Sequence, residues 1–422
     1  MPLAENNHLS PYLSIVVTSR NDNHGGDMLS RMQIFLTTLL KQCREYKLAA
    51  ELIIVEWNPP ANALPLDQCL DFSEKNDYCP IKIITVPTEY HRSLSYSKEL
   101  PLFQMIAKNV GIRRARGEFV LATNIDVIFS TELIKFLRRR CLKHGRIYRI
   151  DRTDVKRDIP AKSDLPEIQH YCKRNILRIC TKDGVISSRY NVILLLKSFW
   201  LNNFRMISLP IDNKIKEILP WLPSKEHWLS LLRTGTYNQR TLSVALRHIQ
   251  RAYRYFGNSA LPIEAGDVYR RSGDTTVLDT TPPDPKTPCF RNNNKFQRLH
   301  TNACGDFTLL ARKDWFDLNA NPEWEMFSFH LDSVFLYLAE AKGLKESVLK
   351  PPARLFHIEH SAGFTPETGK AMYARIRKLG IPILTSTDLA EIRKTIHQTK
   401  TLYPANKDDW GLMKYKLTER LI

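Results

Sequence analysis

Short apolar runs and longer amphipathic segments alternate along the first 150 residues. The short runs are rich in β-branched residues and predict strands at 13–18, 51–57, 81–86 and 118–121. In the longer segments apolar residues recur at spacings of three and four, which predicts helices at 28–46, 102–116 and 130–142. Strands that alternate with helices are typical of βαβ units and a parallel sheet.

Beyond Asp151 this pattern loosens until about residue 302. Residues 155–290 hold basic helical stretches and several tryptophans, and the proline-rich run at 275–294 does not favour regular structure. Regular order returns with a strand predicted at 307–311, a helix at 331–341 and a strand at 355–358. The pattern therefore predicts an ordered part at 1–150, a helical or irregular insertion or subdomain at 151–300, and a second ordered part with C-terminal helices at 301–422.

The composition is that of a globular protein, with 43% hydrophobic and 25% charged residues. The longest apolar runs, such as 52–55 and 192–196, are far shorter than the roughly 20 residues of a membrane span. Residues 1–10 have neither the basic start nor the apolar stretch of a signal peptide. The eight cysteines show no CxxC pair and no metal-ligand spacing. We expect a cytoplasmic protein with reduced thiols.

The formal net charge of +18 points towards an anionic partner. Nucleic acid, acidic lipid headgroups and a phosphate-bearing substrate all fit, but no zinc finger or RNP-type strand accompanies the charge, so nucleic acid is not expected. Residues 192–256 mix aromatic and basic side chains. Such a segment suits peripheral contact with an anionic membrane, but it also suits a helical lid or core insertion with a solvated basic face.

Polar residues follow the predicted strands at their carboxyl ends. They are Ser19, Arg20 and Asn21 after the first strand, Glu56 at the end of the second, and Asn124 and Asp126 after the fourth. Ligands of open parallel sheets bind outside these ends, because loops and helix N-termini converge there. The arrangement predicts a nucleotide site at this edge.

The segment at 107–119 reads AKNVGIRRARGEF. It resembles the N-x-G-x-x-x-A-x-G-E segment that leads into the DxD strand of family 2 glycosyltransferases, which have the GT-A fold. The opening strand and Glu56, which stands where the family often has an Asp that holds the nucleobase, are similar too. This resemblance covers residues 13–150 and 302–360, and it adds Asn109 to the nucleotide-binding residues.

The resemblance implies an α/β fold of the GT-A type: a Rossmann-like, mainly parallel sheet flanked by helices, here with a large basic helical insertion. The implied reaction moves a sugar from a nucleoside diphosphate sugar to a glycan, lipid or protein acceptor. The donor half would lie in residues 1–150 and the acceptor half in 301–422.

The triplet Asn124-Ile125-Asp126 stands where the family has DxD. A Mg or Mn ion would neutralise the leaving diphosphate, and Asp126 supplies one carboxylate for it, whereas Asn124 offers only a neutral carbonyl or a hydrogen bond to ribose. The family also implies a late histidine ligand, for which His357 is the first choice and His360 the second. Alternatively, Asp126 caps the following turn and the histidines are surface residues.

An inverting transfer needs a carboxylate that takes a proton from the acceptor hydroxyl. By resemblance to the acceptor half of the family, Asp332 is the first candidate for this base and Asp306 the second. An Asp at a helix N-terminus is also a common stabilising choice, so a structural role for Asp332 stays open.

Two other functions remain possible from the residues alone. A nucleotidyltransferase shares the sheet and the metal, but it usually has a Gly-rich basic loop after the first strand, where this chain has Ser-Arg-Asn-Asp. A non-catalytic protein that binds a membrane or polyanion could keep a degenerate transferase fold. P-loop and serine-hydrolase motifs are missing from the sequence.

Overall fold

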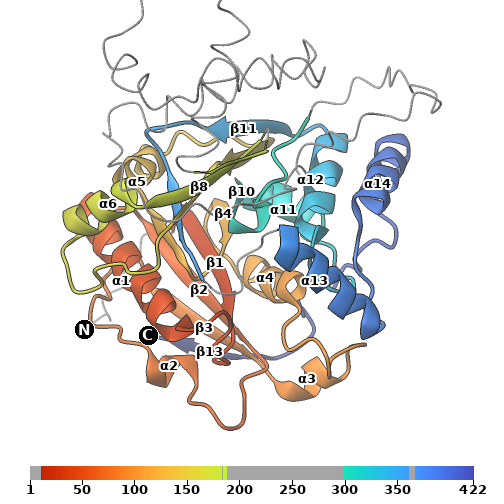
Figure 1. Cartoon of the computed structure of the whole chain (residues 1–422), viewed down its shortest axis with the longest axis horizontal. Coiled ribbons are helices and arrows are strands. Elements are labelled where there is room, and N and C mark those ends of the chain that lie inside the picture. Colours follow the sequence, from red (N-terminus) through yellow and green to blue (C-terminus); the bar gives the residue numbers. More distant parts are fainter. Residues whose placement is uncertain (1–10, 183, 188–297, 361–365) are drawn as a thin grey trace, which may run out of the picture.

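The computed structural model describes residues 11–182, 184–187, 298–360 and 366–422. A large sheet of eight strands crosses the middle of the molecule (Figure 1). Its strands are β1 (Leu13–Ser19), β2 (Ala50–Trp57), β3 (Ile81–Val86), β4 (Phe119–Thr123), β6 (Arg146–Ile150), β10 (Phe307–Ala311), β11 (Lys345–Leu349) and β13 (Thr418–Leu421). They lie in the order β11-β6-β10-β4-β1-β2-β3-β13.

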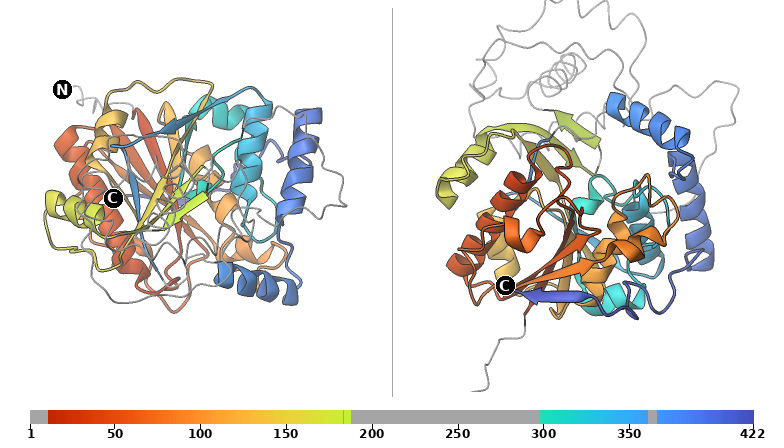
Figure 2. Two further views of the ribbon diagram at one scale, coloured as in Figure 1. Left: turned by 45° about the horizontal axis from the view of Figure 1, so that its top comes forward. Right: turned by 90° about the horizontal axis from the view of Figure 1, so that it is seen from below.

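The centre of this sheet is parallel and its flanks are mixed. Strands β4, β1, β2 and β3 run parallel as neighbours. β10 is antiparallel to both β4 and β6, and β13 is antiparallel to β3 along the opposite edge (Figure 2). The mainly parallel sheet of the sequence prediction is therefore confirmed for the centre only. Because β10 comes from the late part of the chain, both ordered parts build one sheet.

A second sheet has five strands and connects distant parts of the chain. In sheet order, they are β5 (Val127–Phe129), β12 (Leu355–Ile358), β7 (Arg152–Val155), β8 (Ile176–Thr181) and β9 (Gly184–Ser187). The described beginning of the expected helical insertion thus contains three strands, β7, β8 and β9, besides one helix at Leu165–Arg174. The rest of that insertion, including the basic aromatic segment 192–256, lies outside the described residues.

Helices cover both faces of the large sheet (Figure 1). On one side lie α1 (Met28–Tyr46), α5 (Thr131–Arg138) and α6 (Leu165–Arg174), and on the other α4 (Gln104–Arg113), α11 (Arg312–Asp317), α12 (Leu331–Ala341), α13 (Pro366–Lys378) and α14 (Ser386–Thr399). The short helices α2 (Leu66–Cys69) and α3 (Thr88–Arg92) follow β2 and β3. Side chains of β1 alternate between the two layers: Ile15 and Val17 pack in the cluster that contains α1, and Val16 in the one that contains α4.

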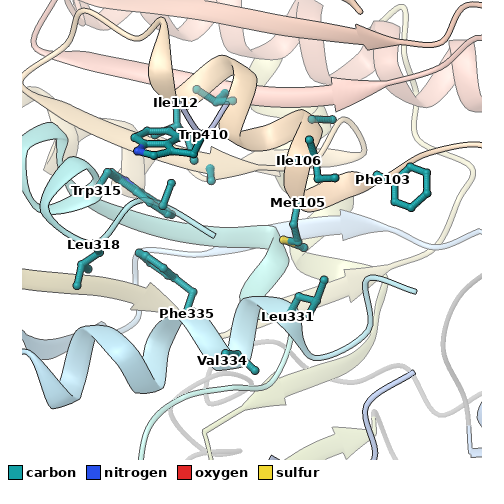
Figure 3. Close-up of a cluster of buried hydrophobic side chains, with 14 of the residues drawn as sticks. Phe103, Met105, Ile106, Ile112, Trp315, Leu318, Leu331, Val334, Phe335 and Trp410 are labelled. Carbon is teal, nitrogen blue, oxygen red and sulfur yellow. The ribbon is translucent and has the colours of Figure 1, made fainter. Parts of the chain in front are cut away.

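The core on the α4 side is rich in aromatic rings (Figure 3). Trp315 of α11 stacks on Phe335 of α12 with ring centroids 4.4 Å apart, and Trp315 Nε1 donates to the Val120 carbonyl of β4 at 3.0 Å. Trp410 from the C-terminal segment joins the same cluster. This packing fixes α12, whose first turn carries Asp332, against the sheet.

Three strands and one helix have the predicted bounds: the strands at 81–86, 307–311 and 355–358 and the helix at 331–341. The helix predicted at 130–142 is shorter: it begins after the N-cap Ser130, whose Oγ accepts from the Leu133 N–H, and ends at Arg138. The cysteines described by the structure are free thiols. None of the described helices combines the length and the apolar character that crossing a membrane requires.

Candidate active site

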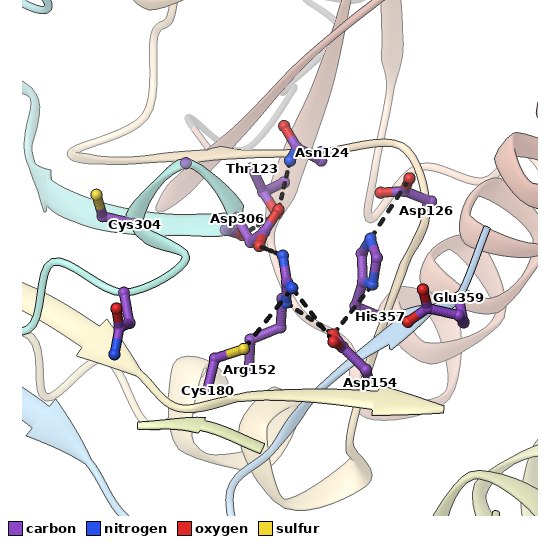
Figure 4. Close-up of polar contacts among 12 residues, drawn as sticks. Thr123, Asn124, Asp126, Arg152, Asp154, Cys180, Cys304, Asp306, His357 and Glu359 are labelled. Atoms are coloured by element: carbon purple, nitrogen blue, oxygen red, sulfur yellow. Dashed lines mark hydrogen bonds and ion pairs between the residues drawn. The ribbon is translucent and has the colours of Figure 1, made fainter. Parts of the chain in front are cut away.

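Asp126 lies between β4 and β5, where three segments distant in sequence meet. Its Oδ2 is 2.7 Å from Nη1 of Arg31 on α1, 3.4 Å from Nε2 of His360 and 3.7 Å from Nε2 of His357. The antiparallel pairing of β5 with β12 sets His357 opposite Val127 and so brings the imidazole to Asp126 (Figure 4). The structure therefore brings together all three residues predicted as metal ligands.

The charges of this cluster favour an ionised Asp126. Burial alone raises the pKa of the Asp126 carboxyl, but His357, His360 and Arg31 outweigh burial and hold that pKa well below its usual range. Asp126 Oδ1 and His360 Nδ1 are buried and have no hydrogen-bond partner among the described residues. Such buried polar atoms call for a partner.

The donor set of Asp126, His357 and His360 fits a divalent cation. One ligand atom from each residue lies within 4.8 Å of the others. A carboxylate with two imidazoles suits Mn or a similar transition ion better than Mg, which prefers oxygen ligands alone. Arg31 already shares the Asp126 carboxylate, so an ion would bind beside a fixed positive charge.

A second set, Asp154, His357 and Glu359, also has metal-ligand spacing. Both of its carboxylates are already paired with guanidinium groups. Asp154 contacts Arg152, with Nε and Oδ1 2.7 Å apart, and also Arg178, and Glu359 Oε2 lies 2.8 Å from Arg178 Nη2. A cation would have to displace guanidinium groups from both carboxylates of this set, whereas Arg31 contacts only Oδ2 of Asp126 and leaves Oδ1 without a partner among the described residues. The set around Asp126 is therefore the better candidate.

Asn124 and Asp306 contact each other directly. Asn124 Nδ2 donates to Asp306 Oδ1, and Asn124 Oδ1 accepts from Gln104 Nε2 at 3.1 Å. Asp306 Oδ2 is 2.7 Å from Arg152 Nη1, so both oxygens of Asp306 are engaged. An Asp at position 124 would set a carboxylate against another carboxylate, and this explains in physical terms why the triplet has an amide there.

Asp332 stands in the first turn of α12, half-buried, after His330 in the left-handed conformation. A Cβ built on Gly305 would lie 3.1 Å from Asp332 Oδ2 and 3.8 Å from Lys108 Nζ, so the missing side chain lets both groups approach. Lys108 is almost fully buried on α4 and donates to the Gly305 carbonyl at 2.6 Å. Burial lowers the pKa of Lys108, and the neighbouring Asp306 and Asp332 oppose that shift.

The residues predicted to bind the nucleotide after β1 hold the loop that follows β2. Arg20 Nε donates to the Asn58 carbonyl and Asn21 Nδ2 to the Leu64 carbonyl, each at 2.8 Å. Ser19 is buried, with its Oγ 3.5 Å from the Met28 sulfur. These side chains thus shape the edge of the sheet, and their contact with a nucleotide stays a prediction.

Glu56 and Asn109 lie deeper in the protein. Glu56 is 1% exposed and its Oε1 accepts from the Leu66 N–H at 2.8 Å; burial raises the pKa of its carboxyl. Asn109 Nδ2 donates both hydrogens, to the Asn321 carbonyl at 2.8 Å and to Glu323 Oε1 at 3.0 Å, while its Oδ1 accepts from the Asn321 N–H at 3.0 Å. Asn109 therefore joins α4 to a later loop and does not join the cluster around Asp126.

Four residues of the site were not predicted from the sequence: Arg31, Lys108, Arg152 and Asp154. Each of them contacts a predicted site residue, or the residue next to one, that lies far away in the sequence. Such a contact leaves no pattern in the sequence around either residue. The one available clue was Lys108, a cation within the mostly apolar buried stretch of α4.

Comparison with models of known protein families finds no match, and neither does comparison with curated proteins. Among solved structures, the chain is similar to the crystal structure of S. aureus TarS 1-349, with a TM-score of 0.37 and 13% identity, covering 92% of this chain and 71% of that chain. It is also similar to S. aureus TarS 1-349 in complex with UDP, with a TM-score of 0.35 and 12% identity, covering 90% of this chain and 69% of that chain. At such low TM-scores neither likeness carries an argument about the site or the activity.

Proposed function

We propose that this chain is a metal-assisted glycosyltransferase, which moves a sugar from a nucleoside diphosphate sugar to an acceptor hydroxyl. The observation that carries the proposal is the buried cluster of Asp126, His357 and His360 at the carboxyl edge of the sheet, with an unpartnered Asp126 Oδ1 among the described residues. A carboxylate candidate for the acceptor base, Asp332, lies on the helix that begins beside Gly305.

In the proposed reaction the acceptor oxygen attacks the anomeric carbon while the bond from that carbon to the diphosphate oxygen breaks. The diphosphate leaves with the bonding electrons, and the hydroxyl proton passes to a carboxylate. A cation held by Asp126, His357 and His360 would supply positive charge for the leaving diphosphate. Arg31 and Lys108 add fixed positive charge in the same region.

Asp332 is better suited than Asp306 to take the proton. Both Asp306 oxygens are occupied, one by Asn124 and one by Arg152, and the residue is 4% exposed. Asp332 is half-buried, and its Oδ1 accepts a hydrogen bond from the Ser333 N–H at 2.8 Å. We propose that the nucleotide binds at the ends of β1, β2 and β4, against the loop that Arg20 and Asn21 hold.

The test is turnover of a panel of UDP- and GDP-sugars by the purified full chain with Mn or Mg. We expect sugar release or transfer in the wild type and a loss of about 100-fold or more in Asp126→Asn and in Asp332→Asn. Asp317→Asn is the matched control, because Asp317 is an exposed carboxylate paired with Lys313 at the surface, and it should retain activity.

Absent turnover in the wild type, or turnover that survives both changes, would overturn the proposal. Release of pyrophosphate from a nucleoside triphosphate and a sugar phosphate would instead identify a nucleotidyltransferase. Binding of a polyanion or an anionic liposome without any turnover would identify the non-catalytic alternative.

A further inference from the structure

A continuous line of polar contacts crosses the candidate site (Figure 4). In order, its members are Asp126, His357, Asp154, Arg152, Asp306 and Asn124. The two ends belong to the triplet that the sequence singled out, whereas the two middle members lie on β7, which no sequence signal marked. The line connects the candidate metal ligands to the Asn124–Asp306 pair.

The contact between Asp154 and His357 is set by the backbone. β7 and β12 are parallel neighbours whose register places Asp154 beside His357. His357 Nδ1 lies 3.1 Å from Asp154 Oδ1, and the other ring nitrogen, Nε2, faces Asp126. Nδ1 and Oδ1 form a close charge contact and not an aligned hydrogen bond. A carboxylate beside Nδ1 still favours hydrogen on that nitrogen, which leaves a lone pair on Nε2, the form that binds a metal.

Asp154 is well placed for this task because it stays an acceptor. Its side chain is fully buried, and guanidinium groups of Arg152 and Arg178 hold it on both sides. An ionised carboxylate in such surroundings has no proton to donate, so it favours hydrogen on the His357 nitrogen beside it. Asp154 lies 3.1 Å from Nδ1, whereas the ionised Asp126 lies farther from Nε2, at 3.7 Å, and so Asp154 decides the position of the hydrogen.

Arg152 extends the same arrangement to the other end of the triplet. Its Nε contacts Asp154 at 2.7 Å, and its Nη1 contacts Asp306 at 2.7 Å. Asp306 in turn accepts from Asn124. The Arg152 guanidinium therefore contacts both Asp154, which lies beside His357, and Asp306, which accepts from Asn124.

We propose that Asp154 is a positioning residue that fixes the His357 imidazole with Nε2 towards Asp126, and that Arg152 couples this setting to Asn124. The proposal rests on the proposed function, since it assigns Asp154 to the support of a metal ligand. The prediction that His357 is a metal ligand does not say what orients its imidazole ring, and this proposal assigns that role to Asp154.

The first measurement is made on the wild type and does not depend on a variant of Asp154. Burial alone lowers the pKa of His357, but Asp126 and Asp154 outweigh burial and raise that pKa. Nitrogen NMR of the metal-free protein is therefore recorded at increasing pH until the His357 ring is neutral, and it then reports which ring nitrogen carries the hydrogen. The His357 signals are assigned by their loss in His357→Gln. We expect the Nδ1–H form in the wild type; the Nε2–H form would overturn the proposal even if Asp154→Asn failed to fold.

The second measurement is Mn affinity, followed by electron paramagnetic resonance in wild type, Asp154→Asn and Thr153→Val. We expect Asp154→Asn to bind Mn about 10 to 100 times more weakly and to show a mixture of ring forms. Thr153 is the neighbouring residue on β7, its Oγ1 is buried without a hydrogen-bond partner in the described part of the chain, and Thr153→Val should bind as the wild type does.

The outcomes separate this proposal from the proposed function. If the wild type does not bind Mn, the metal role of the Asp126 cluster fails, and the ring form still decides the role of Asp154. If the wild type binds Mn and folded Asp154→Asn binds equally well with an unchanged ring form, the positioning role is wrong while the metal site stands.

Discussion

Replacing Asn124 by Asp would restore the acidic residue of a DxD motif, and we expect it to destabilise the protein. Asn124 Nδ2 donates to Oδ1 of Asp306, which is 4% exposed. The substitution removes the donor and sets a second carboxylate against the first. The neighbouring Arg152 contacts the other oxygen of Asp306 and cannot bridge both groups without moving.

The size of the effect follows from the contact. Two unit charges 4 Å apart interact by about 4 kcal/mol at an effective dielectric constant of about 20. That energy raises the pKa of one carboxyl by about three units, from about 4 to about 7. When the pKa of a carboxyl is raised on folding, the protein loses stability as the pH rises from the unfolded pKa to the folded pKa, and the loss is complete above the folded pKa. The penalty should therefore be about 4 kcal/mol at pH 8 and only about 1.5 kcal/mol at pH 5.

The assay is urea unfolding followed by tryptophan fluorescence at both pH values, in EDTA so that no cation relieves the repulsion. Asn124→Ala is the control: it leaves Asp306 without its donor at a cost of about 1–3 kcal/mol, and it adds no titrating group, so its penalty should not change with pH. A penalty for Asn124→Asp that is equal at pH 5 and pH 8 would refute the carboxylate contact.

Two further predictions concern other parts of the structure. Gly25→Ala should cost more stability than Gly145→Ala in thermal unfolding. Both glycines have positive φ, +74° and +69°, which costs a residue with a Cβ about 1–2 kcal/mol. Only at Gly25 would the added Cβ also lie 2.7 Å from His360 Nδ1, whereas nothing among the described residues approaches Gly145. Equal losses would show that the Gly25 loop does not pack on His360. Burial lowers the pKa of His91, whose Nδ1 is 2.9 Å from Trp57 Nε1. The free energy of unfolding should therefore fall as the pH drops below about 6.5, by up to about 1.4 kcal/mol per pH unit. His91→Gln should flatten that slope in urea unfolding. An unchanged slope would exclude His91 as a titrating group.

The fold could be predicted where apolar periodicity decides the structure. The strand at 307–311 and the helix at 331–341 are buried along their apolar positions, and their bounds matched. β7 could not be found in this way, because Arg152-Thr153-Asp154-Val155 buries charged side chains that look like a loop in sequence. Their charges are acceptable inside only because they pair with each other and with Arg178 and Asp306.

The candidate site could be predicted in part. Asp126 and His357 follow from the family resemblance, and the structure brings them together. Arg31 and Lys108 could not be predicted, because their partners lie 95 and 197 residues away in sequence. Asn109 matched a motif, yet its amide is committed to Asn321 and Glu323, since a motif fixes the residue type but not the neighbours that the fold supplies.

The position of β10 between β4 and β6 also bears on how the chain is made. A ribosome adds about 5–20 residues per second, so roughly 10 to 30 s separate the synthesis of β6 from that of β10. During this time β4 and β6 expose edges that can pair with strands of other nascent chains. We expect slower elongation, which lengthens this interval, to favour aggregation, and a fragment that ends before residue 307 to fail to fold by itself.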